Sequence, residues 1–260
     1  MSERANGHPG TDEFYVGYLP VPVRQRMFLR FILPAILWLT VAIAAFTAAR
    51  MRDAGAGVWD TSERRVFVGT LDASPYPILR QAREVGAPAD SPLGSFLLVE
   101  AGKLGGRAGL GELQGRTIRI AGSILRRDVR AMIELAPGHD AVRVEGDGVS
   151  PLPKRVSAGR TRLRGEIVDS KCYLGAMRPG DGKTHRACAQ LCIAGGLPPM
   201  LVTHDAAGNA SYYLLIGPDG AAANEFVHPF VAEPVEVSGT IERVDDLVFV
   251  RLDAGGIKRL

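Results

Sequence analysis

The sequence predicts a mainly β protein in which one N-terminal transmembrane helix is followed by two tandem small β-barrels. Two observations carry this prediction. A run of uncharged, apolar residues near the N-terminus is long enough to cross a bilayer. Farther along, a pattern of alternating apolar residues occurs twice, 117 residues apart, which indicates an internal repeat. A third observation bears on function, because all three cysteines lie in the second copy of the repeat.

The composition excludes several classes of protein. The chain has 260 residues, a length typical of one or two domains, and 46% of them are hydrophobic, too many for a disordered chain. Lys and Arg number 31 against 28 Asp and Glu, so the net charge of +3 gives no sign of a nucleic-acid partner. Three cysteines are too few for a disulfide-dense scaffold.

Residues 30–52 are predicted to form the transmembrane helix. Nineteen consecutive residues from Phe31 to Ala49 carry no charge, and about 20 residues at a rise of 1.5 Å each span the hydrocarbon core. Arginines flank this run on both sides. A cleaved signal peptide is the alternative, but its charged leader would be about thirty residues long, and no good cleavage site follows.

The charges around this helix give little indication of its orientation. Three arginines precede the apolar run and four follow it within fifteen residues, so the positive-inside count is close to even. Long C-terminal segments are translocated largely irrespective of charge, which favours a cytoplasmic tail over residues 1–29 and an exported body. The sequence thus predicts a single-pass protein of the bacterial inner membrane with its C-terminal domains in the periplasm.

The first predicted barrel covers residues 60–148. It opens on a strand at Val66–Leu71, and a second apolar strand follows at Ser95–Val99. Residues 115–135 then alternate between apolar and polar side chains on either side of a charged turn at Arg126–Asp128. This alternation is typical of a β-hairpin.

The second predicted barrel covers residues 160–260 and ends on a hairpin of the same pattern. A shift of 117 residues places Gly122 on Gly239 and Asp128 on Asp245, and the apolar positions keep their register. Each copy has room for about five strands and one irregular or helical crossing before its final hairpin. That is the pattern of a Greek-key barrel of the oligonucleotide/oligosaccharide-binding (OB) type. The strands lack exposed aromatic stacking platforms, so we expect no nucleic-acid ligand.

The three cysteines form the one cluster with chemical potential. Cys172 follows the first strand of the second barrel, and Cys188 and Cys192 lie on a helix predicted from His185 to Ala194. We expect Thr184 to cap this helix, and the glycine pair at 195–196 to end it. A spacing of three and four residues places His185, Cys188 and Cys192 on one helix face, and the preceding loop can bring Cys172 to them.

Three interpretations of this cluster stay open at this stage. An exported protein can join Cys172 to either of the other two cysteines in a disulfide. Alternatively, Cys172, His185, Cys188 and Cys192 can bind a metal ion, with Zn(II) or Cu(I) the natural choices for sulfur ligands. The third interpretation is a redox-active thiol pair, although the sequence has no C-x-x-C motif.

Other candidate residues carry less weight. Met177 and Met200 can serve as thioether ligands to copper, but core packing is the commoner role of methionine. His139, His204 and His228 are expected in a turn, at a strand end and at the barrel rim. Neither a G-x-S-x-G elbow nor an H-E-x-x-H helix occurs, so no catalytic class is indicated.

The second barrel also resembles a group of small exported bacterial domains of uncharacterised function. The resemblance covers about residues 162–252 and rests on the string from Val168 to Cys172, on His185, Cys188 and Cys192, and on the Val-x-Val-x-Gly-Thr hairpin at residues 235–240. It implies export and a barrel fold, and it carries no activity.

These observations together suggest an accessory subunit of a membrane or redox (respiratory) assembly, with a Cys/His structural or metal site. A copper- or zinc-handling protein and a thiol oxidoreductase are the alternatives. We expect a membrane-protein or redox-complex partner.

Overall fold

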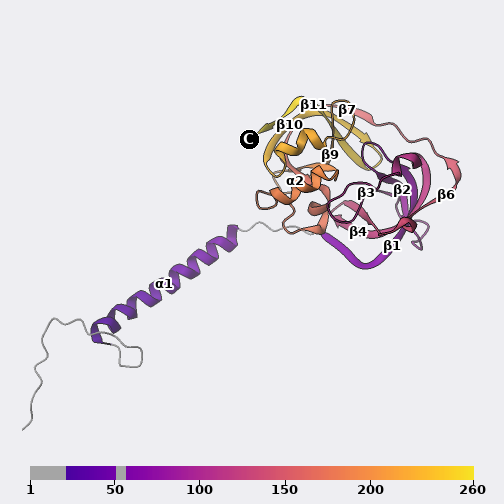
Figure 1. Ribbon diagram of the computed structural model, residues 1–260. Helices are drawn as coiled ribbons and strands as arrows, with labels where there is room; N and C mark the ends of the chain where they lie inside the picture. The colour runs from indigo at the N-terminus through magenta and orange to yellow at the C-terminus, as the bar shows by residue number, and fades with distance from the viewer. Residues whose placement is uncertain (1–21, 51–56) are drawn as a thin grey trace, which may run out of the picture. The chain divides into compact units, whose positions relative to one another are not determined.

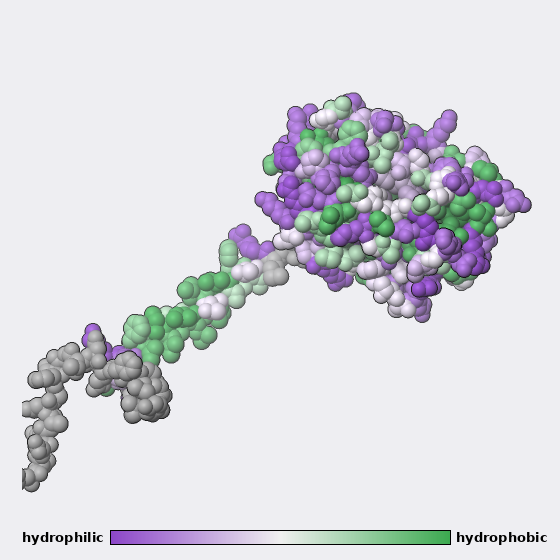
Figure 2. All heavy atoms as spheres, in the orientation of Figure 1, coloured by the Kyte–Doolittle hydropathy of each residue, from purple (hydrophilic) through white to green (hydrophobic). Residues whose placement is uncertain are grey.

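The computed structural model describes residues 22–50 and 57–260 (Figure 1). Helix α1 (Val23–Arg50) is, among these residues, the one helix long and apolar enough to cross a membrane. It begins seven residues before the predicted span because arginine is a good helix former and lets the helix continue beyond the apolar run. Hydrophobic residues cover the helix along most of its length (Figure 2). Most of the predicted tail, residues 1–21, lies outside the described residues, as do residues 51–56.

The first barrel is built from five strands that close on themselves. Strand β1 pairs with β2, followed in order by β3, β5 and β4, and β4 returns to pair with β1. A sixth strand, β6, adds to the outside of β4, and a short 3-10 helix, η1 (Leu110–Leu113), precedes β4. The strands are β1 (Val58–Asp72), β2 (Ile78–Glu84), β3 (Gly94–Val99), β4 (Arg116–Arg127), β5 (Arg130–Leu135) and β6 (Val142–Val149).

The second barrel repeats this topology. Its strands close in the order β7, β8, β9, β11 and β10. In both barrels the third and fifth strands run parallel, and Leu97 opposite Met132 in the first becomes Leu214 opposite Phe249 in the second, a shift of 117 residues. The predicted fold class is therefore confirmed. The strands are β7 (Val156–Asp169), β8 (Pro199–His204), β9 (Ala210–Ile216), β10 (Pro234–Val244) and β11 (Leu247–Arg259).

The repeat extends to residues with special backbone requirements. Asp128 and Asp245 occupy the same turn in the two hairpins, with left-handed φ angles of 50° and 48°. Gly122 lies so close to the next strand that a Cβ atom there would be 2.3 Å from the carbonyl oxygen of Glu134. The equivalent Cβ on Gly239 would be 2.2 Å from a backbone carbonyl oxygen. Both glycines thus allow the close strand contact on which the barrel closes.

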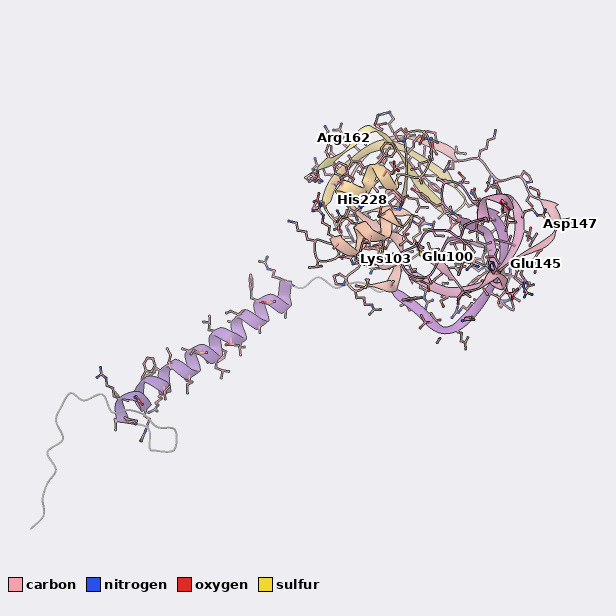
Figure 3. The ribbon with its side chains drawn as sticks, viewed as in Figure 1. Glu100, Lys103, Glu145, Asp147, Arg162 and His228 are labelled. Carbon is pink, nitrogen blue, oxygen red and sulfur yellow. The ribbon has the colours of Figure 1, made fainter. Side chains whose placement is uncertain are left out.

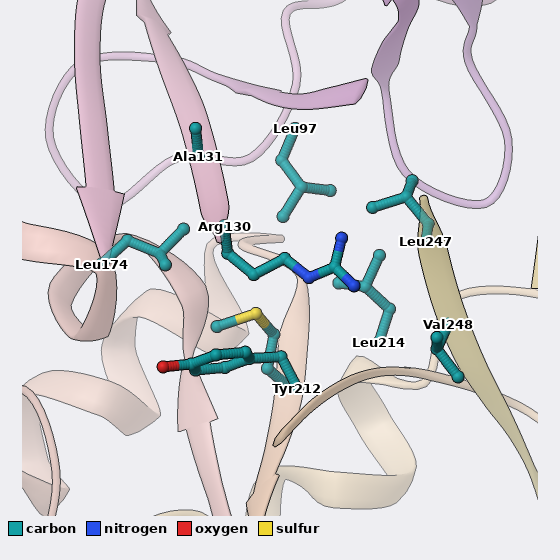
Figure 4. A pocket seen from close by; sticks show the side chains of 9 residues that line it. Leu97, Arg130, Ala131, Leu174, Tyr212, Leu214, Leu247 and Val248 are labelled. Carbon is teal, nitrogen blue, oxygen red and sulfur yellow. The ribbon is translucent and has the colours of Figure 1, made fainter. Parts of the chain in front are cut away.

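The two barrels pack against each other and share one hydrophobic core cluster. Tyr76 of the first barrel is buried in the joint, where its hydroxyl donates to the carbonyl oxygen of Leu215 (2.6 Å) and accepts from the backbone N–H of Ala223 (2.8 Å). A small pocket lies in the same joint, and its lining side chains come from both barrels, as Figure 4 shows for Leu97 and Leu247. The barrels therefore form one structural unit.

Candidate metal centre

The candidate site lies where the second barrel turns from β7 into α2 (Arg186–Ala194). Cys172 opens a single π-helical turn, η3 (Cys172–Ala176), directly after β7. Cys188 and Cys192 project from α2, and Gly196 ends that helix in a left-handed conformation (φ 91°). The expected start of the helix is wrong by one residue. Helix α2 begins after His185 rather than at it, so His185 and not Thr184 occupies the N-cap position, and the His185 N–H donates to the carbonyl oxygen of Gly182 in the preceding turn.

The structure brings the predicted ligands into two overlapping groups. The sulfur of Cys172 lies 3.9 Å from that of Cys188 and 3.9 Å from that of Cys192, and all three cysteines are free thiols. A ring nitrogen of His185 and the sulfurs of Cys172 and Cys188 lie within 4.8 Å of one another. Cys192 belongs to a second such group, formed with Cys172 and a carboxylate oxygen of Asp169. Cys172 is thus shared between the two groups.

Three of the four predicted ligands are shielded from solvent. Cys172, His185 and Cys192 are 5%, 4% and 1% exposed. Cys188 is only partly buried, so it is the ligand that solvent or another molecule can reach first. A site with this profile is mostly closed and has one accessible sulfur.

Asp169 orients two of the ligands. This residue is the last of β7, and its carboxylate is fully buried. One oxygen accepts the backbone N–H of Cys172 (2.8 Å), and the other lies 3.0 Å from Nε2 of His185. Both oxygens therefore have partners already, and the carboxylate holds the imidazole ring in place with Nδ1 left for another contact.

The site includes a lysine from the other barrel, which the sequence reasoning missed. Nζ of Lys103 lies 2.7 Å from the sulfur of Cys188 and 3.7 Å from that of Cys192. This hydrogen bond to Cys188 raises the pKa of Lys103 above its usual value. No local pattern marks Lys103, since it lies in the glycine-rich loop after β3, more than eighty positions before Cys188 in the chain.

Two sets of backbone contacts hold this loop in place. The ammonium group of Lys171, next to Cys172, donates to the carbonyl oxygens of Glu100 (2.8 Å) and Gly102 (2.7 Å) and forms an ion pair with Glu134. On the other side, the backbone N–H of Gly105 donates to the carbonyl oxygen of Gly195 (2.8 Å), just past α2. Figure 3 labels Glu100 and Lys103 on this loop. The loop is thus tied to residues on both sides of the thiols.

The thiols differ in their tendency to ionise. The pKa of Cys192 is lowered because the thiol of Cys172 donates a hydrogen bond to its sulfur, and the positive charge of Lys103 adds to this effect. The pKa of Cys172 is raised because it is the donor in that bond, because it is buried, and because it faces the charge of Asp169. Cys192 is therefore the more readily formed thiolate of the two.

The remaining sequence candidates are two methionines and three histidines, and Met200 shares a buried core cluster with Cys172 and Cys192. Met200, on β8, is buried in the core that the barrels share, and Met177 is 44% exposed. His204 is exposed at the end of β8, and His139 is exposed on a short 3-10 helix, η2 (His139–Ala141). His228 is half-buried at the start of η4 (His228–Phe230), which follows α3 (Asn224–Val227). Among the described residues, none of these three histidines belongs to a group of His, Cys, Asp or Glu ligand atoms close enough to share an ion.

Comparison with family models, with curated proteins and with solved structures gives no match for this chain. The fold and the site nevertheless define a class. The chain combines two small closed β-barrels, a Cys/His cluster capable of holding a metal ion in the second barrel, and one helix with the length and hydropathy of a membrane span.

Proposed function

We propose that this protein is a membrane-anchored, periplasmic accessory subunit of a membrane or redox (respiratory) assembly, and that its second barrel holds one Zn(II) or Cu(I) ion. The ion is bound by Cys172, His185, Cys188 and Cys192. One observation carries the metal assignment: the sulfur of Cys172 lies 3.9 Å from each of two other sulfurs.

This distance fits shared coordination better than a sulfur–sulfur bond. Zinc binds thiolates at about 2.3 Å, and the edge of a tetrahedron with bonds of that length is about 3.8 Å. A disulfide requires about 2.05 Å and can join Cys172 to only one partner. Cys172 is equally far from both sulfurs and belongs to both groups of ligand atoms, so its position suits a ligand that holds an ion between Cys188 and Cys192.

The surroundings of the ligands support the same assignment. Metal-bound histidines commonly donate their second ring N–H to a carboxylate, and Asp169 is placed to accept that bond from Nε2 of His185. Cys172 and Cys192 are buried, and their thiols become anionic when they bind a metal ion. These negative charges need a compensating positive charge, because an unpaired charge in a protein interior is costly. A bound cation provides that charge.

The membrane anchor and the export of the two barrels are proposed mainly from the sequence. Helix α1 has the length and hydropathy of a membrane span. The translocation of long C-terminal segments and the resemblance to exported bacterial domains favour a periplasmic location for the barrels. Neither barrel carries a recognisable catalytic motif, which favours a supporting role beside a redox partner over an enzyme.

Elemental analysis combined with thiol counting tests the metal assignment. The full chain, purified from membranes in detergent, is expected to hold one equivalent of zinc or copper and to show three free thiols after denaturation without reductant. The C188S and H185Q variants should lose the ion, whereas H204Q, a matched change at an exposed histidine of the same barrel, should keep it. One free thiol with no metal would contradict the assignment and support a disulfide.

The partial exposure of Cys188 favours a second candidate function, the delivery of copper or zinc to a neighbouring protein. Transfer between proteins proceeds by ligand exchange, which requires one ligand that a partner can reach. A transfer protein should give up its ion to a competing chelator within minutes, whereas a permanent structural site should retain it for hours. The exchange rate therefore separates the two candidates.

The lowered pKa of Cys192 beside Cys172 favours the third candidate, a thiol oxidoreductase. Such a protein should reduce a disulfide substrate and leave Cys172 linked to Cys192. A metal-free protein that reduces one disulfide per chain, with the loss of two of its own thiols, would support this candidate over both of the others.

A further inference from the structure

We propose that Lys103 of the first barrel belongs to the metal centre of the second barrel, where its ammonium group donates hydrogen bonds to the Cys188 and Cys192 thiolates while both bind the ion. This inference rests on the proposed metal site and adds a residue that controls its affinity. The first barrel is then a working part of the centre, although it contributes no ligand to the ion.

The position of Lys103 carries the proposal. Its Nζ lies 2.7 Å from the sulfur of Cys188 and 3.7 Å from that of Cys192, so one ammonium group faces two of the three sulfurs. An ammonium group has three donors and no acceptor, so in this position it can donate to both sulfurs but cannot replace a ligand. Lys103 is itself an exposed residue, and its ammonium group lies against the sulfur of Cys188.

The loop around Lys103 fixes this position without help from its side chain. Lys171 binds the carbonyl oxygens of Glu100 and Gly102, and the backbone N–H of Gly105 binds the carbonyl oxygen of Gly195. These contacts tie the loop to the residue beside Cys172 on one side and to the end of α2 on the other. The loop should therefore keep its place when the side chain at position 103 is changed.

Gly195 shows how closely the loop and the site fit together. A Cβ atom on Gly195 would lie 1.8 Å from the carbonyl oxygen of Lys103. The φ of Gly195 is −77°, which alanine adopts freely, so the contact with the loop is the main obstacle to the substitution, and the carbonyl oxygen of Leu191 is farther away at 3.3 Å. An alanine here should push the loop that carries Lys103 away from the thiols without removing any polar group from the chain.

The charges explain what Lys103 contributes. Three thiolates around a divalent ion leave one negative charge, and around a monovalent ion they leave two. The buried carboxylate of Asp169 lies directly behind Cys172 and His185 and adds another. An ammonium group on the sulfurs offsets one of these charges, so it stabilises the bound centre and withdraws electron density from both sulfurs.

The test compares metal binding by the full chain in detergent and by four variants. Co(II) serves as the spectroscopic probe for its sulfur-to-metal charge-transfer band, and Zn(II) measures affinity by competition. K103M should weaken Zn(II) binding about 10- to 100-fold, the usual effect of losing such an outer partner, and should shift the Co(II) band at full occupancy. K103R keeps the charge and the donors, so it should restore most of the affinity. G195A should shift the band in the same direction as K103M.

The matched control is K183M, which removes an equal charge at an exposed lysine two residues before His185. It should leave both affinity and band unchanged. A K103M variant that binds Zn(II) as tightly as the parent, or that keeps the parent band, would overturn the role of Lys103 and leave the metal site standing. A parent chain that binds neither ion would overturn both proposals.

Discussion

Replacing Tyr76 by phenylalanine should destabilise the joint between the barrels by about 2–4 kcal/mol. The hydroxyl donates to the carbonyl oxygen of Leu215 and accepts from the N–H of Ala223, and Tyr76 is 2% exposed, so water cannot take over either bond. A buried N–H left without a partner costs about 1–3 kcal/mol, and the lost bond to the carbonyl adds about 1 kcal/mol.

Urea denaturation of the full chain in detergent, followed by tryptophan fluorescence, measures this effect. With a slope of about 2–3 kcal/mol per molar urea for a domain of this size, the midpoint should fall by about 1 M. The control is Y213F, because the Tyr213 hydroxyl has no hydrogen-bond partner within the described part of the chain. The reasoning is refuted if Y76F shifts the free energy of unfolding by no more than Y213F does.

Three further predictions follow from the structure. Burial raises the pKa of Tyr76 and of Tyr212 in the folded protein. Their contribution to the free energy of unfolding is therefore complete below about pH 10 and is lost as the pH rises further. The urea midpoint should fall above pH 10, and it should fall less in Y76F. Replacing Gly122 by alanine would place a Cβ 2.3 Å from the Glu134 carbonyl oxygen and should lower the free energy of unfolding by at least about 2 kcal/mol. Alanine at Gly148, which lies in open space, should lower it by less than about 0.5 kcal/mol. Equal melting temperatures for the two variants would contradict this prediction. Removing the ion with a chelator should lower the melting temperature of the parent chain but not of C188S, and an unchanged parent would count against a bound ion.

The repeated barrel could be predicted because its signals are local. Alternating apolar residues, a turn at Asp128 or Asp245, and the glycines at 122 and 239 each mark a strand or a turn within a few residues. The 117-residue shift then links the two copies, and the parallel strand pairs obey it to the residue.

The packing of one barrel on the other could not be predicted in the same way. Tyr76 meets Leu215 across 139 positions of sequence, and no periodic pattern marks either residue as an interface residue. Contacts of this kind depend on how two finished surfaces fit, which a single sequence does not encode in any local signal.

Part of the candidate site could be predicted from local sequence signals, and the rest could not. His185, Cys188 and Cys192 could be placed on one face because helical spacing is regular, and Cys172 could be placed near them because its loop is short. The role of Asp169 needed the three-dimensional structure, because its two oxygens serve residues three and sixteen positions away. The position of Lys103 beside the thiols could not be predicted either, because it depends on how the two barrels pack against each other. One sign was nevertheless present, since two of only five lysines in the chain, Lys103 and Lys171, lie beside the thiols.

X-ray absorption at the metal edge tests the central claim most directly, because it reports the atoms bound to the ion. For the full chain purified with its native ion, the proposal predicts a first shell of three sulfurs at about 2.3 Å and one imidazole nitrogen at about 2.0 Å. A shell made only of nitrogen and oxygen atoms, or a chain that carries no ion, would contradict it.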